Sequence, residues 1–68
     1  MGREEVELNI GNYINTPVGL QLLAGYQVSV LKEKGKLKVY PNSISLLCWS
    51  EDGGLYHHDA VDCEVANG

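Results

Sequence analysis

The segment GYQVSVLKEKGKLKVYP, residues 25–41, constrains the fold most, because apolar and polar residues alternate on both sides of a turn. Such alternation is typical of half-buried β-strands, and the intervening KEKG suits a four-residue turn with Gly35 in the left-handed region. Pairing Val30 with Leu37 places Val28 opposite Val39, so that all four side chains share one face of a predicted hairpin.

The opposite face of this hairpin carries lysines, which we interpret as a solvated side that protects an edge strand. Pro41 cannot donate a ladder hydrogen bond and is predicted to end the second strand. If the protein binds an anionic ligand such as a nucleotide, this hairpin supplies candidate contacts, which are Lys34, Lys36, Lys38 and Tyr40.

The remaining chain reads as further short strands. Residues 4–10 alternate as a strand with an acidic outer face, and residues 61–65 as a short last strand with Val61, Cys63 and Val65 inward. Residues 44–49 and 55–58 form a second hairpin around Asp52–Gly53. For residues 17–24 we predict a short helix that begins at Pro17, with a strand as the alternative.

These elements predict one small β-rich domain that spans residues 1–68, either all-β or α+β. We expect a small barrel or a twisted antiparallel sheet of five to six short strands with at most one short helix. A chain of 68 residues has a marginal core, and self-association is one common remedy.

The stretch ISLLCWSEDGGLYHHD, residues 44–59, is apolar on both sides of one strand. If Asp52 and Gly53 alone form the turn, one side of the second hairpin completes the core. The other side then carries a patch that few remaining elements can cover, and aromatic side chains with polar tips are common interface anchors. The alternative is that the helix over 17–24 covers this patch. The predicted interface residues are Leu47, Trp49, Tyr56 and His58.

Charge and cysteine usage narrow the function classes. The net charge of −4 argues against non-specific nucleic-acid binding. We find neither a signal peptide nor an apolar run long enough to cross a membrane, and we read Cys48 and Cys63 as reduced thiols of a cytoplasmic protein, with a disulfide as the alternative.

Metal binding and catalysis lack a specific motif. Cys48, His57 and Cys63 offer zinc-binding atoms, but their spacing matches no zinc signature, so we predict no metal and no cofactor. A nucleophilic Cys48–His57 pair would need an orienting group and an oxyanion hole that nothing marks. We therefore predict that the protein is not an enzyme.

Residues Gly11–Pro41 resemble the swapped-hairpin family of antitoxins and transition-state regulators. In that family a Gly-Asn turn, a Pro-started short helix and a V-x-V…G-x-L-x-V-x-P hairpin follow in order, and Val28, Val30, Leu37, Val39 and Pro41 match best. The helix here is shorter, the basic residues before it are absent, and the hairpin pattern is common, so no family is assigned. The resemblance implies an intertwined dimer and a DNA-binding or toxin-neutralising role.

The expected function is that of a small acidic protein that binds a partner stoichiometrically as a homodimer or higher oligomer. Other small acidic proteins of this kind are often regulators or inhibitors, including viral proteins of phages and accessory proteins carried by plasmids, and we expect the same of this protein. One alternative is a DNA-binding or antitoxin-like regulator. The other is an oligomeric protein that binds a small nucleotide-type ligand.

Overall fold

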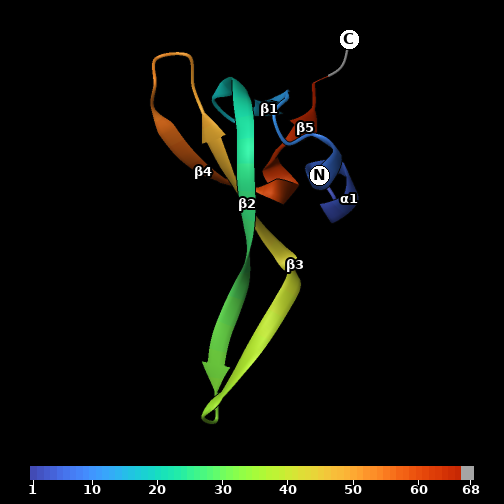
Figure 1. Cartoon of the computed structure of the whole chain (residues 1–68), viewed down its shortest axis with the longest axis vertical. Helices are drawn as coiled ribbons and strands as arrows, with labels where there is room; N and C mark the ends of the chain where they lie inside the picture. The colour runs from blue at the N-terminus through green and yellow to red at the C-terminus, as the bar shows by residue number, and fades with distance from the viewer. Residues whose placement is uncertain (67–68) are drawn as a thin grey trace.

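The computed structural model describes residues 1–66, which form one antiparallel sheet of five strands in the order β4-β3-β2-β1-β5 (Figure 1). The prediction of a β-rich twisted antiparallel sheet with one short helix is confirmed. In chain order the elements are α1 (Arg3–Leu8), β1 (Tyr13–Thr16), β2 (Gly19–Glu33), β3 (Lys36–Trp49), β4 (Leu55–Asp59), the 3-10 turn η1 (Ala60–Asp62) and β5 (Glu64–Val65).

The strand predicted for residues 4–10 is wrong, because Arg3–Leu8 form the helix α1. Acidic residues in the first turn favour a helix N-terminus, and the Glu5 carboxylate accepts a hydrogen bond from the Gly2 N–H at 3.1 Å. Only Val6 of this helix is buried, whereas Leu8 is 80% exposed. The alternation of apolar residues in this segment therefore does not correspond to the buried face of a strand.

The helix favoured for residues 17–24 is also wrong, and the strand alternative is confirmed from Gly19 onward. Pro17 and Val18 occupy the turn between β1 and β2, where Thr16 pairs with Gly19. The Thr16 hydroxyl accepts from the Val18 N–H at 3.2 Å and donates to the Gly19 carbonyl at 2.7 Å. Proline fits this turn because its φ is already fixed.

Strands β2 and β3 form the long hairpin predicted for residues 25–41, and its outer half extends away from the rest of the chain (Figure 1). We call residues 29–40 the arm. It accounts for the elongated dimensions of 44 × 23 × 18 Å. Pro41 does not end the second strand as predicted; β3 continues to Trp49 after a bulge in which residues 41–43 have no partner on β2.

The turn at the tip of the arm differs from the predicted four-residue turn. Glu33 pairs with Lys36, so only Lys34 and Gly35 lie between the strands. Their φ angles of 51° and 80° are both positive, as a type I′ turn requires. The register is shifted by two residues from the prediction, because Val30 pairs with Val39 instead of Leu37. An even shift keeps every side chain on its predicted face.

The β3–β4 hairpin is closed by a longer loop than the predicted two-residue turn. The Ser50 N–H donates to the Gly54 carbonyl at 2.9 Å and the Gly53 N–H donates to the Ser50 carbonyl at 3.0 Å. Gly53 has φ +85°, which matches a type I turn followed by a left-handed glycine. Trp49 consequently pairs with Leu55 instead of Tyr56. This one-residue shift moves all of β4 to the opposite faces.

The predicted last strand over residues 61–65 is only partly right. Ala60–Asp62 form η1, and Val61 is 83% exposed instead of inward, whereas Cys63 is buried as predicted. The two residues of β5 then pair with Ile14 and Asn15 of β1.

The core lies on one face of the sheet, which we call the inner face. Strand residues of this face pack beneath α1, η1 and the residue that follows η1. The Met1 amino group donates to the carbonyls of Ala60 at 2.6 Å and Cys63 at 3.0 Å, which joins the α1 end of the chain to η1. The buried apolar residues are Val6, Ile14, Leu23, Ile44, Leu46, Cys48, Ala60 and Cys63.

Two leucines of β3 test where the core ends. Leu46 is fully buried, whereas Leu37, on the arm, is 75% exposed. We expect Leu46→Ala to lower the free energy of unfolding by about 2–5 kcal/mol, because it leaves a cavity. The matched Leu37→Ala should change it by less than about 0.5 kcal/mol. Urea unfolding followed by circular dichroism measures both, and equal losses would contradict the assigned core.

Candidate functional site: an uncovered apolar face and a basic arm

An apolar row crosses four strands on the face of the sheet opposite the core, which we call the outer face. Tyr13 of β1 pairs with Leu22 of β2, Leu22 pairs with Trp49 of β3, and Trp49 pairs with Leu55 of β4. Directly paired residues point to the same side of a sheet, so these four side chains form a continuous band. We call it the outer row.

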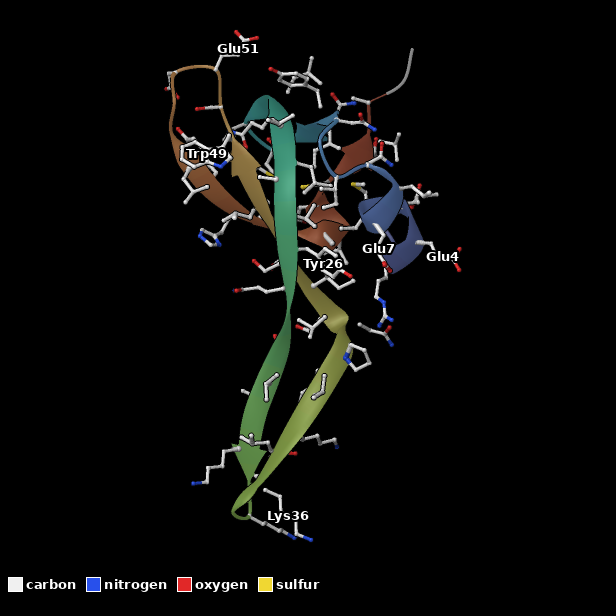
Figure 2. The ribbon with its side chains drawn as sticks, viewed as in Figure 1. Glu4, Glu7, Tyr26, Lys36, Trp49 and Glu51 are labelled. Carbon is white, nitrogen blue, oxygen red and sulfur yellow. The ribbon has the colours of Figure 1, made fainter. Side chains whose placement is uncertain are left out.

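The outer row is left in contact with water. Tyr13 is 50% exposed, Trp49 41% and Leu55 47%, and the neighbouring Leu20 on the same face is 58% exposed. Contiguous exposed apolar patches, unlike scattered apolar residues, mark interaction sites. In Figure 2, Trp49 lies beside β4, and α1 lies on the opposite side of the molecule.

The structure brings together only half of the predicted interface patch. Leu47 and Trp49 lie on the outer face, but Tyr56 pairs with Cys48 and His58 with Leu46, which places both on the inner face. The prediction that these four residues share a face is therefore wrong. The cause is the extra loop residue, which turned β4 over.

Sequence reasoning missed the members of the outer row that β1 and β2 contribute. Tyr13 lay outside every strand predicted from the sequence, and Leu20 and Leu22 lay in a segment for which a helix was favoured. A usable signal was present, since Pro17 lies between two runs that contain large apolar residues, 13–16 and 20–23. Reading residues 13–22 as a tight hairpin would have paired Tyr13 with Leu22.

Tyr56 and His58, which are not part of the outer face, lie on the inner face of the edge strand β4. The rings of Tyr56 and His58 are stacked, with centroids 6.0 Å apart. His58 Nε2 lies 2.8 Å from Oε1 of Gln21, a side chain that is only 2% exposed. An amide oxygen can only accept, so Nε2 carries the proton in this bond. His58 thus satisfies the one buried polar residue of the described core.

The Gln21–His58 bond can be tested against the adjacent histidine. His58→Ala leaves the buried Gln21 oxygen without its donor, and we expect a loss of about 1–3 kcal/mol in the free energy of unfolding. His57, which is exposed on the outer face, should tolerate His57→Ala within about 0.5 kcal/mol. Denaturant titrations at constant pH compare the two variants, and a smaller loss for His58→Ala would contradict the bond.

The residues predicted to contact an anionic ligand all lie on the arm. Lys36, Lys38 and Tyr40 occupy every second position of β3 and so share one face, whereas Lys34 is in the turn. This face also holds Glu33, which accepts from the Tyr40 hydroxyl at 3.0 Å and lies 4.0 Å from Lys38 Nζ. The hydrogen bond to Glu33 raises the pKa of Tyr40. Lys38 and Tyr40 are therefore already engaged within the arm.

Charge is strongly segregated between the arm and the rest of the chain. The arm holds four lysines and one glutamate, a net charge of +3. The rest holds one arginine and eight acidic residues, a net charge of −7, and the two sums give the total of −4. Figure 2 shows Lys36 at the tip of the arm and Glu51 at the opposite end of the molecule.

The two cysteines are buried free thiols of the core. Burial, and after it the nearby Cys63, raises the pKa of Cys48 to about 11, and burial also raises the pKa of Cys63. His57 lies on the outer face, so it does not converge with them. Within residues 1–66 no cluster of metal-binding side chains is present. The reactive thiolate needed for nucleophilic chemistry is disfavoured.

The raised pKa of Cys48 predicts that stability falls in alkali. An unfolded thiol ionises near pH 9.0 and the folded one near pH 11, so the stabilising contribution is complete below pH 9 and is lost as pH rises toward 11. We expect the free energy of unfolding of the wild type to decrease over this range. Cys48→Ala, though less stable, should show a shallower decrease; parallel slopes would contradict the assignment.

No family model, curated protein or solved structure matches the chain. The helix that the swapped-hairpin resemblance requires is replaced by the β1–β2 turn and the start of β2. No helix among residues 1–66 is long and apolar enough to span a bilayer. The same residues enclose no pocket.

Proposed function

We propose that the protein is a small non-enzymatic binding protein that acts by stoichiometric contact as a homo-oligomer. The observation that carries this proposal is the outer row, a continuous apolar band across four strands that this chain leaves in water. Covering the exposed part of Tyr13, Trp49 and Leu55, each between 41% and 50% exposed, would contribute on the order of 1 kcal/mol per residue. A tyrosine and a tryptophan in the band are typical interface anchors.

As part of this proposal, the protein acts in the cytoplasm as an accessory regulator or inhibitor of the kind carried by phages and plasmids. The free, buried thiols Cys48 and Cys63 suit a reducing compartment. The acidic surface outside the arm suits a protein that must remain dissolved at high concentration. The origin is inferred by association with small acidic proteins of that kind.

The outer row should control the oligomeric state. We expect the wild type to sediment as a dimer or larger species and Trp49→Asp to associate at least about tenfold more weakly, since about 1.4 kcal/mol gives that factor. Val61→Asp is the matched control, because Val61 is an exposed apolar residue on η1, away from the row. Sedimentation velocity over a concentration series measures all three.

Two readouts keep this test informative if Trp49→Asp folds poorly. Leu55→Asp alters the same row from the edge strand β4. In the wild type, the emission of the single tryptophan should shift to shorter wavelength as association buries it. A wild type that stays monomeric at every concentration, or row variants that sediment like the Val61→Asp control, would overturn the proposal.

A DNA-binding regulator is a second candidate because the arm is a protruding two-stranded ribbon with four of the five basic residues. The major groove of DNA admits such a ribbon. Retention of the wild type on duplex DNA of random sequence at low salt, lost as salt rises, would support this candidate. A nucleotide-type ligand has less support, since residues 1–66 enclose no pocket and a site would require a second chain.

A further inference from the structure

We propose that the arm of one copy docks on the outer row of a second copy, and that the second copy returns the same contact. This inference rests on the proposed self-association and specifies which surface covers the row. The contact joins the two features that remain unsatisfied within a single chain.

The arm carries apolar side chains that are not buried in the core of their own chain. Val30 is 49% exposed, Val39 55% and Leu37 75%, and the pairing places all three on one face of the ribbon. An isolated two-stranded hairpin is marginally stable in water, and a further layer or strand is needed to hold it. The arm extends away from the other elements, so its own chain does not provide that layer (Figure 1).

The outer row offers an apolar surface with acidic residues beside it. Glu64 pairs with Asn15 on the outer face, two residues along β1 from Tyr13. Glu51 follows Trp49 by two residues, in the loop after β3, and is exposed. An apolar strip bordered by carboxylates matches a ribbon with an apolar face and lysines at its tip.

Charge selects a second copy as the occupant. The arm has a net charge of +3 and the rest of the chain −7, so an arm is attracted to the body of another molecule. Complementary potentials of this kind guide association and set the register. Nucleic acid is the weaker match, because the apolar face of the arm has no counterpart on a phosphate backbone and the acidic body repels it.

A two-fold dimer makes this contact twice. Each chain has one arm and one outer row, so the reciprocal arrangement leaves no copy of either surface free. A one-way contact would instead extend into a chain of molecules. The attraction between exposed charges is screened by salt, so the dimer should weaken as ionic strength rises.

Reversing the charge of each surface separately tests the pairing. Lys32→Glu with Lys34→Glu gives the arm two lysines and three glutamates, a net charge of −1, and leaves the Glu33–Lys38 pair in place. Glu51→Lys with Glu64→Lys reverses the two carboxylates beside the row. Each double variant alone should associate at least about tenfold more weakly than the wild type at low salt, because like charges then face each other.

Mixing the two double variants should restore the dimer. The acidic arm of the first faces the basic border of the second, while the lysine arm of the second faces the unchanged acidic border of the first. With one variant labelled with nitrogen-15, native mass spectrometry should show mainly the mixed dimer. Recovery in the mixture also shows that both variants are folded.

Several results would overturn the inference. These are self-association of either double variant at the wild-type strength, and a mixture that stays monomeric. If Trp49→Asp abolishes association but charge reversal does not, the outer row is an interface and the arm is not its occupant. If the arm variant still forms dimers but loses retention on random duplex DNA, the arm contacts nucleic acid instead. A wild type that is monomeric throughout removes the proposed function itself.

Discussion

The structure depends on one constraint: the sheet has two apolar faces and the chain can cover only one of them. Val6 of α1, Ala60 of η1 and Cys63 pack on the inner face and complete the core. The helix has six residues and the 3-10 turn three, so little remains to form another layer. Domains normally bury each apolar face against another layer. The outer row is therefore left uncovered by the chain itself.

The sequence was sufficient to predict the excess of apolar surface but not all of its members. Leu47 and Trp49 flank the buried Cys48, and both faces of that strand were correctly identified as apolar. The partner strand was misplaced because Asp52–Gly53 was read as the whole turn. The choice between a two-residue and a three-residue loop depends on side-chain bonds: the Asp52 carboxylate accepts from the Gly54 N–H at 2.9 Å and from the Ser50 hydroxyl. The sequence pattern does not show which of these hydrogen bonds form, and a shift of one residue moves every side chain of the strand to the opposite face.

The other wrong assignments concern short segments in which local and tertiary preferences conflict. Residues 3–8 alternate like a strand, yet they form a helix of which only Val6 is buried in the core. Residues 17–24 carry helix signals at Pro17, but eight residues gain little from helix cooperativity, and pairing with β1 and β3 decides the outcome. The hairpin of the arm and the faces of its side chains were predicted correctly, although its turn and register were not, because the alternation and the glycine turn both favour a hairpin.

The arm and the outer row together distinguish this protein from a sheet that is merely incomplete. Polar residues at Trp49 and Leu55 would make the outer row less apolar without disturbing the core, because both side chains contact water. The β2–β3 hairpin could likewise be short, whereas both strands extend far beyond Ile44, the last buried residue of β3 toward the tip of the arm. The four lysines lie on that extension, and eight of the nine acidic residues lie elsewhere. Uncovered apolar surface and separated charge occur at the same two places, and the proposed contact between copies would account for both with a single geometry.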